Sequence, residues 1–76
     1  MKGKVGESTK KLYRVDKKDI SFIKFIFEAC DGVAIMTTIC PKSGIILFCI
    51  APGREEEFEE VLAGLGEQII IEDVKI

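Results

Sequence analysis

The spacing of hydrophobic and polar residues changes along this chain, and each change predicts a secondary-structure element. Residues 11–16 alternate with a period of two, which is typical of a strand with one buried face. From Lys17 to Cys30 the apolar residues recur at steps of three and four, which predicts an amphipathic helix. Asp16 is suited to cap the start of this helix, and Gly32 to end it. The chain is therefore expected to begin with a strand and a helix.

The apolar arc of this first helix is wide. Phe22, Phe25 and Ala29 lie outside the main apolar stripe. Two interpretations follow: a small domain spreads its few aromatic residues broadly, or Phe22 or Phe25 contacts another subunit.

The middle of the chain holds two apolar segments, residues 33–40 and 45–51, around the sequence Pro-Lys-Ser-Gly. Val, Ile, Thr and Phe favour strands, and Pro and Gly favour turns, so this region predicts a β-hairpin. In both strands the odd and the even positions are apolar, so neither face of the hairpin reads as polar. A turn flanked by Pro41 and Gly44 predicts three opposed pairs: Cys40 with Ile45, Thr38 with Leu47, and Met36 with Cys49.

The last third of the chain predicts a second helix and a final strand. Between Pro52 and Gly66 the apolar residues keep a helical spacing, and glutamates occupy the opposite side and the first turns. Residues 67–76 contain three consecutive isoleucines before a charged, alternating end. This pattern indicates a mostly buried strand.

The order strand, helix, strand, strand, helix, strand leaves few topologies. Right-handed crossovers place both helices on the same side of the sheet, and the strands then pair in the order 4-1-3-2. The predicted fold class is therefore α+β, a ferredoxin-like βαββαβ two-layer sandwich with a four-stranded antiparallel sheet and two helices on one face. Residues 1–9 are expected to form a flexible N-terminal segment, and residues 10–76 a single domain.

A sheet with helices on one face leaves its other face uncovered. The bulkier hairpin residues are assigned to the helix side, namely Val33, Ile35, Ile39, Ile46, Phe48 and Ile50. The remaining apolar residues, with one leucine from the first strand, form a predicted interface: Leu12, Ala34, Met36, Cys40, Ile45, Leu47 and Cys49. An exposed apolar patch of this size indicates an interaction surface. A homodimer is the expected cover, by stacked sheets or by joined edge strands.

Composition removes several classes of partner. The chain has 76 residues, of which 47% are hydrophobic, and a formal net charge of -2. It therefore has no broad positive field for a phosphate backbone, and no nucleic acid partner is expected. The longest dense apolar stretch, Ile20 to Cys30, is far shorter than the roughly 20 residues of a membrane helix. Since residues 1–9 also lack the apolar run of a secretory signal, a cytoplasmic location without membrane contact is expected.

The cysteines offer one candidate for chemistry. Three cysteines without histidine match neither a disulfide framework nor a zinc motif, so reduced thiols and no metal or cofactor are expected. Cys40 is the thiol best placed to react, because it ends a strand and Lys42 is close enough to lower its pKa. A thiol-dependent or accessory enzyme component using Cys40 is therefore one alternative function.

Two further segments carry polar groups of interest. Asp16 and Asp19 form either a carboxylate pair or helix caps. The backbone N–H groups of Gly53 and Arg54 precede the second helix, an arrangement that accepts anions, although glutamates follow directly. RNA binding is a third alternative for this fold, but Tyr13 and Phe48, the strand aromatics, are expected to face the helices.

Three motifs carry a resemblance to a known family. They are RVDKKDI between the first strand and helix, EACDGVA at the exit of that helix, and APGREEE before the second helix. Across residues 12–65 the sequence resembles a small bacterial family, domain of unknown function 4911. That resemblance implies the fold and no known activity.

More remotely, the element order and the VDKKDI junction are similar to ACT domains, regulatory modules that often bind amino acids between paired subunits. This similarity implies a ligand near Asp16, Lys17, Lys18 and Asp19. The lysines stand where ACT domains commonly carry a glycine-containing turn. The expected function is thus a non-enzymatic, homodimeric module that binds a small amino-acid-like ligand or a protein partner.

Overall fold

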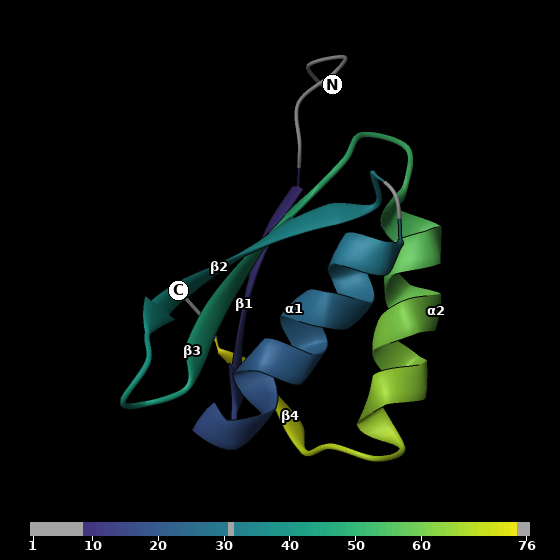
Figure 1. Ribbon diagram of the computed structural model, residues 1–76. Helices are drawn as coiled ribbons and strands as arrows, with labels where there is room; N and C mark the ends of the chain where they lie inside the picture. Colours follow the sequence, from purple (N-terminus) through teal and green to yellow (C-terminus); the bar gives the residue numbers. More distant parts are fainter. Residues whose placement is uncertain (1–8, 31, 75–76) are drawn as a thin grey trace.

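The computed structural model describes residues 9–30 and 32–74. Within this part of the chain the predicted order of strands and helices is confirmed (Figure 1). The elements are β1 (Thr9–Val15), the short 3-10 helix η1 (Lys17–Asp19), α1 (Ile20–Ala29), β2 (Ala34–Cys40), β3 (Ile45–Ile50), α2 (Glu55–Gly66) and β4 (Ile71–Val74). The predicted flexible segment of residues 1–9 lies outside the described residues, except for Thr9, which opens β1.

The four strands form one antiparallel sheet in the order β2-β3-β1-β4. This is the predicted order, written from the opposite edge. Helices α1 and α2 lie side by side on one face of the sheet (Figure 1). The fold is therefore the predicted α+β, ferredoxin-like βαββαβ sandwich, and neither helix covers the other face of the sheet.

The junction between β1 and α1 follows the prediction at Asp16 and departs from it at Asp19. The side chain of Asp16 accepts a hydrogen bond from the backbone N–H of Lys18 at 3.1 Å. This cap starts the 3-10 turn η1, and the α-helix begins only at Ile20. Asp19 makes no side-chain capping hydrogen bond, so of the two aspartates expected as helix caps only Asp16 acts as one. The two aspartates therefore lie at the two ends of η1, Asp16 as its N-cap and Asp19 as its last residue.

The three consecutive isoleucines, residues 69–71, have different environments. Ile69 is buried, Ile70 is 80% exposed, and the strand begins at Ile71, opposite Val15. The predicted burial is therefore wrong at Ile70. The chain leaving α2 pairs with β1 only from Ile71 onward, so Ile70 has no neighbouring strand to shield it.

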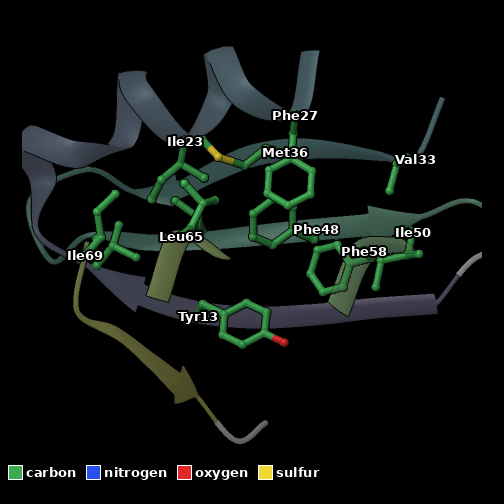
Figure 2. Packing of buried hydrophobic residues seen from close by; sticks show 12 residues of the cluster. Tyr13, Ile23, Phe27, Val33, Met36, Phe48, Ile50, Phe58, Leu65 and Ile69 are labelled. Atoms are coloured by element: carbon green, nitrogen blue, oxygen red, sulfur yellow. The ribbon is translucent and has the colours of Figure 1, made fainter. Parts of the chain in front are cut away.

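Aromatic side chains from both layers meet at the centre of the core. Phe27 of α1, Phe48 of β3 and Phe58 of α2 pack together with Tyr13 of β1 (Figure 2). The Phe48 ring lies 4.7 Å from that of Phe27 and 5.0 Å from that of Phe58, measured between ring centroids. Each such aromatic pair contributes about 0.5–1.5 kcal/mol beyond its buried area. This cluster attaches both helices to the same face of the sheet.

Strands β2 and β3 pair in a register that differs from the predicted one. Cys40 lies opposite Ile45, as predicted, but an irregularity between Thr38 and Cys40 inserts Ile39 as an extra residue. Since side chains alternate between the two faces, one inserted residue moves the rest of β2 to the other face. The predicted pairs Thr38 with Leu47 and Met36 with Cys49 are therefore wrong. Beyond the bulge the pairs are Thr38 with Ile46, Thr37 with Leu47, Met36 with Phe48, Ile35 with Cys49, and Ala34 with Ile50.

This bulge changes which residues of β2 enter the core. Met36 is 8% exposed and points toward the core beside Phe27 (Figure 2), and Ala34 also packs against the core. Ile35 is 71% exposed and Ile39 is 54% exposed. The predicted placement of Ala34 and Met36 on the open side, and of Ile35 and Ile39 on the helix side, is therefore wrong. The remaining helix-side prediction, for Val33, Ile46, Phe48 and Ile50, is confirmed.

The turn between β2 and β3 is anchored to the end of β1. The backbone N–H of Val15 donates a 2.9 Å hydrogen bond to the carbonyl of Gly44, which has a positive φ of 73°. A Cβ atom at Gly44 would lie 1.8 Å from the carbonyl oxygen of Val15. Only glycine fits here, and this contact fixes the hairpin against β1.

Candidate functional site

The face of the sheet that points away from the helices is the candidate interaction site, and we call it the open face. Residues directly opposite each other in antiparallel strands share a face, so the strand registers define its members. They are Lys10, Leu12, Arg14, Ile35, Thr37, Cys40, Ile45, Leu47, Cys49, Glu72 and Val74.

Most of the predicted interface residues lie on this face. They are Leu12, Cys40, Ile45, Leu47 and Cys49. Ala34 and Met36 are the exceptions, because the bulge turns them toward the helices, and Ile35 takes the open position instead. Sequence reasoning missed Ile35 because both alternating sets of β2 are apolar.

The charged side chains of the open face all lie in one half of it. The half formed by β1 and β4 carries Lys10, Arg14 and Glu72, and Arg14 Nη2 lies 2.6 Å from Glu72 Oε1. The half formed by β2 and β3 has no charged residue, and we call it the apolar half. It consists of Ile35, Thr37, Cys40, Ile45, Leu47 and Cys49. Of the described elements, both helices lie on the other face of the sheet, so neither covers the apolar half.

Leu47 occupies the middle of the apolar surface. It lies opposite Leu12 on β1 and opposite Thr37 on β2, and Ile45 and Cys49 flank it along β3 on the same face. Leu12, Ile45, Leu47 and Cys49 are each half-buried, since neighbouring side chains shield their flanks. The surface is therefore a continuous apolar strip across three strands.

The candidate ligand-binding residues do not form one site. Asp16, Lys17, Lys18 and Asp19 lie where β1 ends, beside the hairpin turn, at the lower end of Figure 1. Gly53 and Arg54 lie before α2, at the upper end. The length of β3 separates these ends by about 17 Å. A single small ligand does not span both groups.

The surroundings of Arg54 are acidic. Its Nε and Nη2 atoms donate hydrogen bonds to Glu57, the second at 3.1 Å, and these bonds lower the pKa of the Glu57 carboxyl. A shallow hollow of about 560 Å³ beside Arg54 is lined by Glu57 and Glu60 together with Cys30 and Val33. The two carboxylates oppose an anionic ligand at this place.

Cys40 is the one candidate for reactivity that gains support. Hydrogen bonds from the Ser43 hydroxyl and then its backbone lower the pKa of the Cys40 thiol, and the Lys42 backbone adds to this effect. The prediction named Lys42 and missed Ser43, whose only sequence signal was its place in the turn. All three cysteines are free. Within the described part of the chain, no cluster of cysteine and carboxylate side chains has the geometry to hold a metal ion.

Comparison with known proteins identifies the family. The sequence matches the domain of unknown function (DUF4911) over residues 13–69. The chain belongs to this family. No curated protein and no solved structure gives a significant match.

Membership in the DUF4911 family confirms the resemblance found in the sequence. The matched region runs from the middle of β1 to the residues just before β4, so it includes the hairpin and both helices. The family description names no activity, and the open face is therefore the main guide to function. Among the described residues, no helix is both long enough and apolar enough to cross a membrane.

Proposed function

We propose that this DUF4911 protein is a non-enzymatic protein-interaction module that works as a homodimer in the cytoplasm. The observation that supports it is the apolar half of the open face, above all Ile35, which is 71% exposed on strand β2. Contiguous exposed apolar surface of this kind marks interaction sites in proteins that stay in solution. The three free thiols accord with a reducing compartment.

The charge distribution supports a second copy as the partner. Helix α2 carries five glutamates between Glu55 and Glu60, of which Glu57 and Glu59 are ion-paired with Arg54 and Lys11. Its exposed side is still acidic and repels another copy of itself. The apolar half carries no charge, so two copies can meet there without like charges in contact. A two-fold dimer is also the commonest assembly that places one patch against itself.

Sedimentation of the intact protein over a range of concentrations tests this proposal. We expect a reversible shift from 8.5 kDa toward twice that mass as the concentration rises through the micromolar range. A protein that stays at 8.5 kDa throughout would refute the homodimer.

Matched glutamate variants identify the surface. Leu47→Glu, on the open face, should weaken the dimer at least tenfold, because it places a carboxylate in the apolar half. Phe25→Glu is the control, since Phe25 is 66% exposed on α1, on the other side of the molecule. It should leave the dimer unchanged. The reverse result would move the interface to the helices and refute the role of the open face.

A second candidate function is a thiol-dependent role for Cys40. The observation that favours it is the pair of hydrogen bonds from Ser43 that lower the pKa of Cys40. Alkylation at neutral pH separates the two candidates. Modification of Cys40 much faster than of Cys30 favours thiol chemistry, whereas uniformly slow modification favours a packing role.

The amino-acid-like ligand implied by the ACT resemblance stays a prediction. A thermal-shift screen of amino acids tests it, with Lys17→Ala and Lys18→Ala as variants of the junction after β1. Stabilisation that is lost in these variants would support a ligand there. No stabilisation by any amino acid would leave protein interaction as the function.

A further inference from the structure

We infer that the second copy stacks face to face on the open face, with Leu47 next to the two-fold axis, and that it does not join the sheet at an edge strand. This inference rests on the proposed homodimer and specifies its geometry. It follows from the length, charge and regularity of the two edge strands, from the position of the apolar strip, and from the charges around that strip.

Both edges of the sheet are poorly suited to pair with another strand. The edge strand β4 has four residues in the described part of the chain, and Glu72 and Asp73 are two of them. The opposite edge strand, β2, is uncharged, but the bulge between Thr38 and Cys40 interrupts its regular backbone spacing. Short length, charge and bulges are the features by which proteins prevent edge-to-edge pairing.

Edge pairing would also leave the apolar strip exposed. Leu47 lies one strand in from the β2 edge and Leu12 lies two strands in, at about 5 and 10 Å from β2. A copy joined to β2 extends the sheet sideways and covers neither residue. A stacked copy, with its sheet about 10 Å away, covers both.

The symmetry of the strip places Leu47 at its centre. Leu12 and Thr37 flank it across the strands, and Ile45 and Cys49 flank it along β3. In a two-fold interface, the residue next to the axis meets its own copy. A stacked dimer centred on the strip therefore packs Leu47 against Leu47 of the second copy.

The charges and the size of the face agree with a reversible dimer. Arg14 and Glu72 are paired with each other, and the exposed Lys10 lies on β1 opposite Cys49, outside the apolar half, so a stack centred on that half leaves the Lys10 ammonium free to reach solvent. With strands of up to seven residues, the whole four-stranded face measures on the order of 400 Å² in plan, or about 800 Å² for two copies, and the apolar half is about half of it. Interfaces below about 1,200 Å² belong to weak and transient complexes.

Two surface variants distinguish stacking from edge pairing. Leu47→Glu should raise the dimer dissociation constant at least tenfold, because two carboxylates then face each other at the axis. Thr38→Lys puts a charge on the exposed edge strand β2, outside the stacked interface, and should change the constant less than threefold. Far-ultraviolet circular dichroism at low concentration checks that both variants keep the fold.

Contacts within the unaltered dimer give a second, independent measurement. In a mixture of isotope-labelled and unlabelled protein, NMR should show methyl contacts from Leu47 to Leu47 and Leu12 of the other copy. Contacts confined to β2, or a dimer that survives Leu47→Glu and is lost in Thr38→Lys, would overturn stacking while the homodimer stands. A monomer at every concentration would refute the homodimer and stacking together.

Discussion

Strand β3 presents two apolar faces whose environments differ completely. Ile46, Phe48 and Ile50 are each 0% exposed beneath the helices. Ile45, Leu47 and Cys49, which alternate with them, are only partly buried on the open face. The two sets have nearly the same hydrophobicity, so burial here depends on which elements cover each face and not on residue type.

Ile46, Phe48 and Ile50 hold the monomer together, whereas Ile45, Leu47 and Cys49 are left for contacts between molecules. The covered set packs into the aromatic cluster with Phe27 and Phe58. The open set makes no equivalent contact with the helices, so its apolar surface is available for binding. Four predictions test this separation.

The largest contrast is expected between Phe48 and its neighbour Leu47. Phe48→Ala removes the centre of the aromatic cluster and should reduce the free energy of unfolding by about 4 kcal/mol. That loss is a large part of the stability of a domain of this size. Leu47→Ala should cost about 1 kcal/mol in dilute protein, because partly buried residues lose less on truncation than fully buried ones. Urea denaturation of both variants measures the difference, and equal losses would contradict it.

Substitution of Gly44 tests how much the contact between the hairpin turn and Val15 contributes to the free energy of unfolding. Gly44→Ala should lower the free energy of unfolding by about 3 kcal/mol, from left-handed strain and the collision with the Val15 carbonyl. Gly53→Ala is the matched control. Gly53 also has a positive φ, but a Cβ atom there meets nothing within 4 Å. It should cost only about 1 kcal/mol. Thermal denaturation compares the two variants, and a similar cost for both would show that the Val15 contact has little effect.

The Cys40 thiol, on the open face, gives a prediction for the pH dependence of alkylation. Ser43 lowers the pKa of Cys40, so more thiolate is present at a given pH than in an ordinary thiol. Ser43→Ala should therefore move the midpoint of the pH profile for Cys40 alkylation upward and slow the reaction severalfold near neutral pH. Cys49, which lies far from Ser43 along β3, serves as the internal control. An unchanged Cys40 profile would remove the evidence for an activated thiol.

The smallest effect is expected in the charged half of the open face. Both partners of the Arg14 and Glu72 ion pair are more than half exposed, so solvent screens their attraction. A double-mutant cycle with Arg14→Ala and Glu72→Ala should give a coupling of about 0.5 kcal/mol or less. A coupling above about 1 kcal/mol would show that this half of the face contributes to the stability of the monomer.

Much of the architecture could be predicted from local patterns. The period of two in β1, the helical spacing around Phe27 and Phe58, and the turn ending at Gly44 lead to the observed order of elements. The handedness of the crossovers then gives the observed strand order. For the candidate site, Leu12, Leu47 and Cys49 were placed correctly, because β1 and β3 are regular and keep their alternation.

The sequence by itself determined the order of elements, the topology, and the presence of more apolar surface than two helices can cover. Only the tertiary structure decided which residues of β2 lie on each face. In Ala34–Cys40 both alternating sets are largely apolar, so the periodicity does not show which side chains point toward the helices and which toward the open face. The bulge at Ile39, which places Met36 in the core and Ile35 on the open face, depends on the pairing of β2 with β3 and the packing beneath α1.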